Sequence, residues 1–247
     1  MFLIGSVVAV LIVASALMIP SMRAYLPFQQ TGYQQQTGYQ PGTLDYYAEQ
    51  AQAQGLAEYH FSAGIYEYRV SRSWDDVVAR FSFVVAEPIE MKSYPTQGVG
   101  GDDGIQSWYR FRVIEQLSSK PPPFVLGPLP SDLQPAQPDQ LWVFKPGGIL
   151  QRNGVQLVAD EPSFPAYSFG QRYLLILYVD PTTRYGAIVM GSQAVYFVTS
   201  SGTLSSVDPV GSVFETDLAS RYNNSLDQLL AALNGMPSST PTPKAAG

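Results

Sequence analysis

The chain has 247 residues, of which 45% are hydrophobic and only 14% are charged, and its net charge of −6 gives a pI near 4.7. This length holds one sizeable domain with extensions, or at most two small domains. The acidic balance argues against nucleic acids and anionic membrane surfaces as partners, because both favour clusters of Lys and Arg.

The side chains that most often bind metals are nearly missing, since the chain has no Cys and a single His, His60. Disulfides, thiolate metal sites, cysteine nucleophiles and multi-histidine metal sites are therefore excluded. We expect neither a metal nor another cofactor. A Ser-His-Asp triad would have to use His60 as its base, and His60 lies in a polar stretch outside the predicted strands.

Residues 1–24 predict a targeting or membrane segment, because residues 2–20 are apolar, uncharged and about long enough to cross a bilayer core. A cleaved signal peptide, a retained membrane anchor and a buried core helix all fit this pattern. Either of the first two makes the remainder extracytoplasmic, that is, periplasmic, secreted or membrane-anchored. Membrane contact is expected only through this segment.

Residues 25–43 form a linker rich in Gln, Tyr and Gly, in which residues 30–34 recur as residues 36–40. The repeat has no aliphatic residue, so it predicts a flexible tether, with contact to a glycan or another chain as the alternative. Residues 44–72 are a lead-in segment. It is predicted to hold a helix over 44–59 capped by Thr43 and a short strand over 61–71.

Residues 73–207 carry the β-domain. Ser73 and Asp76 are spaced like a capping box, and Trp74, Val77, Val78 and Phe81 form one apolar stripe, so a short helix is predicted over 73–81. A strand over 81–94 follows, in which Pro88 indicates a bulge or an edge position. A second strand covers 108–117, where Trp108, Arg110 and Arg112 face one side, and Tyr109 and Phe111 the other.

Two connections have alternative interpretations. Asp102 and Asp103 lie beside glycines in a loop over 95–106, but they lack the ligand spacing of an EF-hand, which leaves a hairpin loop or a cation site. Residues 118–138 contain seven prolines. They predict a rigid crossover lying across the barrel, or a polyproline II ligand.

A β-meander is predicted over residues 141–198, because short runs of β-branched and aromatic residues alternate with turn residues. The runs are 141–144, 155–158, 172–179, 185–190 and 194–198. Asn153–Gly154 fits a two-residue hairpin turn and Asp180–Pro181 a second turn. The run 172–179 is apolar at nearly every position, so it is expected to be covered on both faces or central in a closed barrel.

Residues 208–235 are predicted to hold a C-terminal helix, and residues 236–247 a disordered tail. Ser225 and Gln228 are spaced like a second capping box. Leucines follow at helical spacing, at positions 226, 229, 230 and 233. They must be buried on the β-domain or on another chain, and the second case would make an oligomer.

The order of these elements resembles netrin-like modules, whose five-stranded OB-type barrel also occurs in tissue inhibitors of metalloproteinases. Residues 75–78 and 83–88 resemble the first strand of that class, and residues 108–113 resemble the second. Residues 146–148 and 169–177 resemble segments of uncharacterised bacterial secreted proteins with this architecture. The resemblance covers residues 73–207. It implies a mainly β fold, a small OB-like barrel of five to six strands with short flanking helices, after an N-terminal hydrophobic helix. The animal inhibitors bind zinc through an N-terminal Cys, which this chain lacks, so no functional residue carries over.

The candidate binding residues are Trp108, Arg110, Arg112, Trp142 and Tyr185. With Tyr109 and Tyr167, the aromatic members would make a platform for a sugar or peptide, because OB barrels bind ligands on one face. Cross-strand or core packing is the alternative role for such aromatic residues. Likewise, Arg110 and Arg112 would form a small cationic spot or part of a solvated strand face.

Three functions remain open. The first is a non-enzymatic extracytoplasmic binding or structural module whose partner is an unknown protein or glycan. The second is a carboxylate-dependent hydrolase, which requires His60 and two acids to converge in one cleft. Glu87 and Glu90 are a poor pair for it, since they are three positions apart on a strand and, without a bulge, they face opposite sides. The third is a subunit of a cell-surface assembly formed through residues 25–43 and the C-terminal helix.

Overall fold

The computed structural model describes residues 39–62, 73–97, 103–117, 120–123, 129–161, 164, 166–208 and 211–235. The predicted N-terminal hydrophobic helix, most of the linker and the tail from 236 lie outside these ranges. The chain divides into two units, residues 1–37 and 38–247, and every described element belongs to the second. In these ranges no helix combines the length and apolar character needed to cross a membrane.

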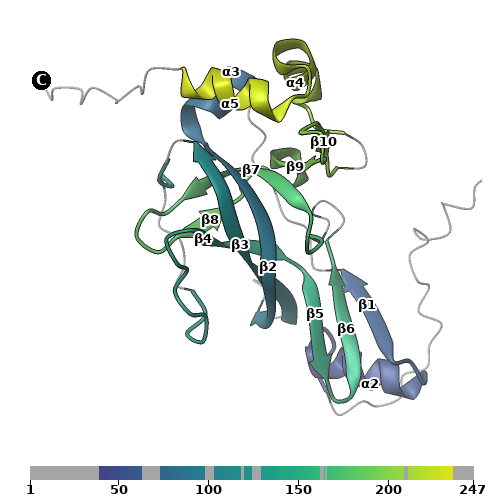
Figure 1. Cartoon of the computed structure of the whole chain (residues 1–247). Coiled ribbons are helices and arrows are strands. Elements are labelled where there is room, and N and C mark those ends of the chain that lie inside the picture. Colours follow the sequence, from purple (N-terminus) through teal and green to yellow (C-terminus); the bar gives the residue numbers. More distant parts are fainter. Residues whose placement is uncertain are drawn as a thin grey trace, which may run out of the picture. The chain divides into compact units, whose positions relative to one another are not determined.

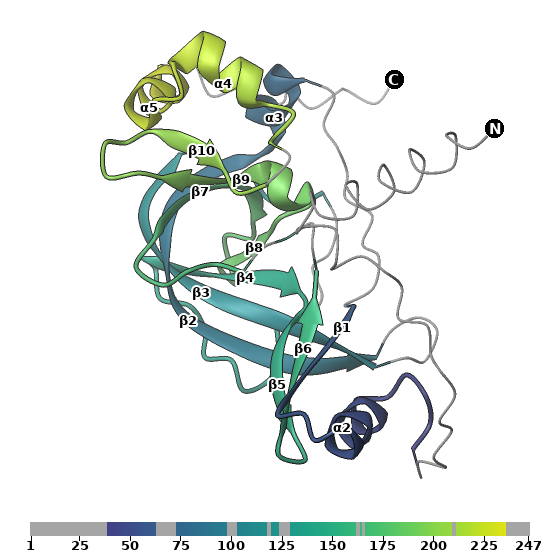
Figure 2. The ribbon, with the colours of Figure 1, turned by 90° about the vertical axis from the view of Figure 1, so that its right-hand side faces the viewer.

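The main sheet has seven strands in the order β10-β9-β7-β2-β3-β4-β8, and an additional pairing of β7 with β8 closes a ring through five of them (Figure 1, Figure 2). The prediction of a mainly β fold is thereby confirmed. The strands are β2 (Ser82–Gln97), β3 (Asp103–Leu117), β4 (Gln140–Pro146), β7 (Arg172–Val179), β8 (Tyr185–Ala187), β9 (Val195–Val198) and β10 (Leu204–Ser206).

Strand β7 is buried on both faces, as its apolar run predicts. Successive side chains of a strand point to opposite faces. Leu174 and Ile176 therefore pack outward into one hydrophobic cluster, whereas Leu175 and Leu177 pack into the interior of the ring. The two edges of β7 are used as well, since β2 pairs along one of them, and β9 and then β8 along the other.

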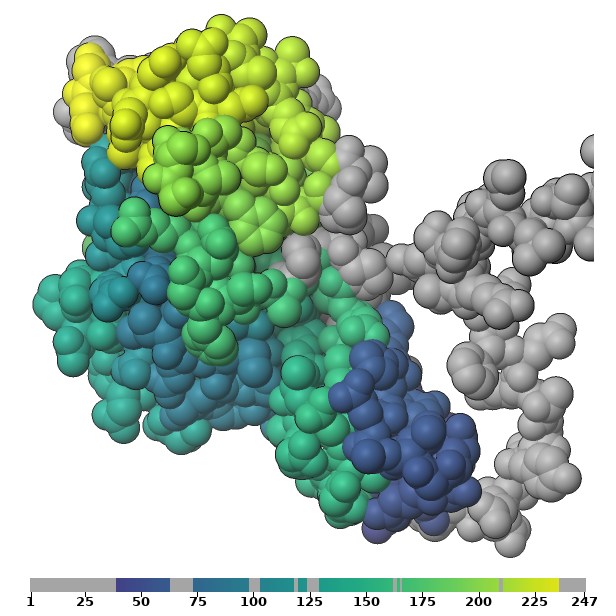
Figure 3. All heavy atoms as spheres, turned by 45° about the vertical axis from the view of Figure 1, so that its right-hand side comes forward, coloured from purple at the N-terminus to yellow at the C-terminus, as the bar shows by residue number. Residues whose placement is uncertain are grey.

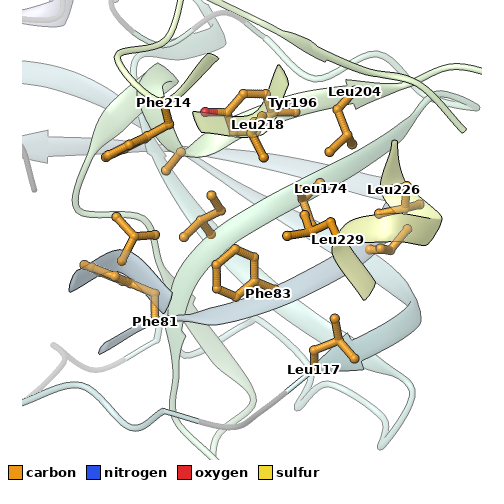
Figure 4. Close-up of a cluster of buried hydrophobic side chains, with 14 of the residues drawn as sticks. Phe81, Phe83, Leu117, Leu174, Tyr196, Leu204, Phe214, Leu218, Leu226 and Leu229 are labelled. Carbon is orange, nitrogen blue, oxygen red and sulfur yellow. The ribbon is translucent and has the colours of Figure 1, made fainter. Parts of the chain in front are cut away.

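Three helices cover the outward face of β7 and its neighbours: α3 (Trp74–Arg80), α4 (Glu215–Tyr222) and α5 (Leu226–Asn234). Figure 4 shows Phe83 and Leu174 of the sheet facing Leu218 and Leu229 of the helices. The short helix predicted after Ser73 is confirmed, because Ser73 Oγ accepts a hydrogen bond from the Asp76 backbone N–H.

The C-terminal segment holds two helices where one was predicted. The break falls at Asn223 and Asn224, whose φ values of 51° and 53° end α4 in the left-handed region. Ser225 then caps α5, as predicted. Leu226 and Leu229 are buried against this chain's own β-domain, so of the two predicted surfaces for the leucines the β-domain is the one used.

The predicted meander is wrong in its middle. Strands β5 (Gly148–Arg152) and β6 (Val155–Asp160) leave the ring and join β1 (Glu58–Ser62) in a separate three-stranded sheet, covered by α2 (Leu44–Ala53). In addition, β9 pairs with β7 and not with β8, the strand before it in the chain. The chain leaves the ring at Gly147 and Gly148, with φ values of 76° and 149° that L-residues rarely adopt. The predicted helix begins at Leu44 with Thr43 as its cap, but it ends at Ala53 and not at residue 59, because residues 58–62, including His60, form strand β1. The Asn153–Gly154 hairpin is confirmed.

This exit from the ring depends on Gly148. A Cβ there would overlap Ser107 Oγ, whereas a Cβ at Gly154 meets nothing within 4 Å. Gly148→Ala is therefore expected to lower the free energy of unfolding by about 3 kcal/mol, from backbone strain plus overpacking. Gly154→Ala carries only the strain, about 1 kcal/mol. Urea unfolding of both variants tests this, and equal losses would contradict the steric argument.

Candidate functional site

The predicted aromatic binding residues come together, but they are covered. Trp108, Trp142 and Tyr185 form one cluster on the outer face of the ring, each with at most 9% of its surface exposed. Leu133 of the Pro-rich connection packs onto them, and Trp142 Nε1 donates a hydrogen bond to the Gln134 carbonyl at 2.9 Å. The described part of the connection around Leu133 and Gln134 thus covers the cluster, so the predicted aromatic platform is not exposed.

The other two aromatic candidates lie elsewhere. Tyr109 and Tyr167 pack inside the ring with their ring centroids 4.9 Å apart. Burial raises the pKa of the Tyr109 hydroxyl to about 12. These two residues therefore belong to the core, as the packing alternative predicted.

The predicted cationic spot is neutralised by neighbouring acids. Arg110 pairs with Glu90, and its guanidinium lies 5.5 Å from the centre of the Trp142 ring. Arg112 pairs with Glu87 at 2.7 Å. A bulge between Pro88 and Glu90 shifts the register of β2 against β3, so both glutamates reach the arginine-bearing face. The interpretation as a solvated, ion-paired strand face agrees with this geometry.

His60 lies between two carboxylates on the outer face of the small sheet. Its Nδ1 is 2.8 Å from Asp160 Oδ2 and its Nε2 is 2.7 Å from Glu58 Oε1. These hydrogen bonds raise the pKa of the imidazole above its ordinary value. The side chains are about half exposed. The three groups thus converge on an open strand face, and no cluster of His, Asp and Glu in the described ranges is arranged to hold a metal.

Lys145 was missed by the sequence analysis. It is 5% exposed, donates to the Pro146 carbonyl and lies 6.0 Å from the centre of the Phe164 ring. Burial lowers the pKa of its amine to about 8. The alternation of Leu141, Val143 and Lys145 along β4 was the signal, since the first two point into the ring. The amine is enclosed by packed side chains, so we assign Lys145 a structural role at the end of β4, where the chain leaves the ring.

A cavity of about 390 Å³ lies between β10 and α4. Its apolar wall is formed by Leu204, Leu218, Ala219 and the ring of Tyr196. Polar groups of Ser205, Ser206, Glu215, Thr216 and Asn224 complete the lining. Figure 3 shows the region, where the strands before residue 210 meet the C-terminal helices.

The wall of this cavity is held rigidly. The Tyr196 hydroxyl shares a hydrogen bond of 2.6 Å with Ser212 Oγ and donates to the Gln193 carbonyl. On the far side, the Leu204 N–H donates to the Asn224 carbonyl at 2.7 Å. Strand and helix are thus fixed on both sides of an open polar cavity. No sequence motif marked it, because residues from three separate elements form it.

Comparison with known proteins supplies no family for this chain. No protein-family model matches the sequence, and no curated protein matches it.

The lone imidazole makes a pH dependence predictable. Because the folded pKa of His60 is raised, its bonds to Glu58 and Asp160 contribute stability fully below the unfolded pKa of about 6.5. That contribution is lost as the pH rises through the folded value. Urea unfolding between pH 5.5 and 8.5 should show this loss, and His60→Gln should flatten it. An unchanged slope in that variant would rule out the imidazole as its source.

Proposed function

We propose that this protein is a non-enzymatic extracytoplasmic binding module whose ligand occupies the cavity between β10 and α4. The observation that carries the proposal is the lining of that cavity. It combines hydroxyl groups, an amide and a carboxylate with an apolar wall, the mixture that fixes a ligand by hydrogen bonds and contact area. The buried Lys145 and Tyr109 are packed elsewhere, and the buried Tyr196 hydroxyl in the cavity wall is already hydrogen-bonded to Ser212 and the Gln193 carbonyl, which favours recognition over catalysis at the cavity.

We further propose that the five-stranded ring is a barrel of the OB type. Around the ring, the strands follow the order β2, β3, β4, β8, β7, with β4 and β8 parallel and the other neighbours antiparallel. That is the order of an OB barrel, in which the third strand lies beside the fifth. The β5–β6 hairpin would be an insertion between the third and fourth strands. The likeness to netrin-like modules rests on this order and supplies no ligand.

The extracytoplasmic location is proposed from the apolar residues 2–20. Mass spectrometry of the protein isolated from its natural source tests it. A signal peptide predicts an N-terminus within or just after residues 14–24, and a retained anchor predicts an intact chain in the membrane fraction. An intact chain in the cytosolic fraction would contradict both.

A carboxylate-dependent hydrolase is the second candidate, favoured by the convergence of His60, Glu58 and Asp160. The open face around them is the observation against it, since the hypothesis required a cleft. Loss of any hydrolytic activity in His60→Gln, with the cavity variants below unaffected, would replace the first proposal by this one. A surface-assembly subunit is the third candidate, and it now rests on the linker, because α5 is packed on its own domain.

Filling the cavity tests the first proposal. Ala219 lines it and is exposed on α4, and Ser220 is the next residue on the same helix but not part of the lining. Ala219→Trp is expected to weaken binding to peptide and glycan arrays at least tenfold, because the indole occupies the ligand's volume. Ser220→Trp is the matched control and should bind like the unmodified protein. Equal binding by both variants, with unchanged melting temperatures, would overturn the cavity as the site.

A further inference from the structure

We infer that the cavity is a docking groove for an extended peptide carrying a basic side chain. This inference rests on the proposed binding function and names its ligand class. Three features carry it: the free edge of β10, the main-chain groups that this edge presents, and an unpaired carboxylate beside them.

Among the strands that the structure describes, β10 is the last of the main sheet and pairs only with β9. The hydrogen bonds that flank the pair, Thr199 N–H to the Thr203 carbonyl and Val207 N–H to the Val195 carbonyl, fix its alternation. In an antiparallel ladder every second residue bonds across the pair. Ser205 therefore faces β9, and the main-chain groups of Leu204 and Ser206 face the cavity.

Part of this edge is already used. The Leu204 N–H donates to the Asn224 carbonyl, and the Leu226 N–H donates to the Gly202 carbonyl, so residues 224–226 cover the first half of the edge. Beyond them, within the part of the chain that the structure describes, the Leu204 carbonyl and the Ser206 N–H have no hydrogen-bond partner. One residue of a parallel strand placed opposite Ser205 would satisfy both, donating to the first and accepting from the second.

The charge of the cavity selects the side chain. Glu215 lines it and has no ion-pair partner among the described residues, whereas Asp217, in the same turn of α4, pairs with Arg221 at 3.3 Å. A Lys or Arg of the bound peptide would supply the missing partner. Glu215 also lies in the first turn of α4, at the positive end of the helix dipole.

The size of the cavity fits a short segment of chain. A volume of about 390 Å³ accommodates two or three residues, which matches the short length of β10 beyond the part covered by Asn224. A neutral sugar would use the hydroxyls of Ser205 and Thr216 but would leave the main-chain pair as it is. The free main-chain groups and the free carboxylate therefore favour a basic peptide.

The test uses the full chain and three fluorescein-labelled probes: Thr-Val-Lys-Val-Thr, the same peptide with Glu in place of Lys, and the Lys peptide with the central amide N-methylated. Fluorescence anisotropy gives the affinities, and backbone amide shifts of Ser206, Thr216 and Asn224 show where each probe binds. The Lys peptide is expected to bind at least fivefold more tightly than the Glu peptide. N-methylation is expected to weaken it about fivefold or more, because it removes the donor to the Leu204 carbonyl.

Two variants separate the charge from the edge. Glu215→Gln should reduce the preference for Lys over Glu about fivefold, and Asp217→Asn, in the same turn, should leave it unchanged. Ser206→Pro removes an edge N–H that faces away from β9, a position where a sheet tolerates proline, together with the hydroxyl that accepts from the Asp208 N–H. It should weaken all unmethylated probes alike. Melting temperatures of the variants verify folding, and the N-methylated probe gives the same information on the unmodified protein.

Each outcome decides one question. If the peptides fail to shift Ser206 and Asn224 but a neutral glycan panel shifts them, the peptide inference is wrong and the binding function stands. If neither peptides nor glycans shift the cavity amides, both are wrong. Equal affinities for the Lys, Glu and N-methylated probes would also overturn the inference.

Discussion

The whole domain depends on β7 being buried on both faces and paired on both edges. The side chains from Tyr173 to Val179 are all buried, and they alternate between the interior of the ring and the layer under the helices. Each large apolar side chain so buried contributes about 1.5–3 kcal/mol. The outer edge of β7 is shared, first by β9 and then by β8. This sharing closes the ring and at the same time extends the sheet to β10, where the cavity lies.

Local patterns predicted those elements that local physics determines. The sequence patterns correctly predicted four features, because each depends on neighbours within a few residues. They are the cap at Ser73, the Asn153–Gly154 turn, the double burial of residues 172–179 and the leucine face of α5. The direction of the β5–β6 hairpin was not predicted. It depends on the close approach of Gly148 to Ser107, where a Cβ would overlap Ser107 Oγ, and these two residues lie far apart in the sequence. The parallel pairing of β1 with β6 was hidden for the same reason.

The candidate site was even less accessible from the sequence. Trp108, Trp142 and Tyr185 were correctly grouped, but nothing in their spacing indicated that Leu133 would cover them. No sequence motif marks the β10–α4 cavity, because the cavity lies along the edge of β10 that is not paired with β9. An unsatisfied strand edge is a property of the assembled sheet. Only the topology reveals it.

The hydrogen bond between His60 and Asp160 joins residues 100 positions apart. During synthesis the N-terminal strand β1 is made early, yet its partner β6 leaves the ribosome only after most of the ring strands. Strand β1 therefore stays unpaired until β6 is made, just before β7 and β8, the strands that close the ring, and long-range pairings of this kind form slowly. A late-docking N-terminal strand leaves the polypeptide extended at the end that emerges first.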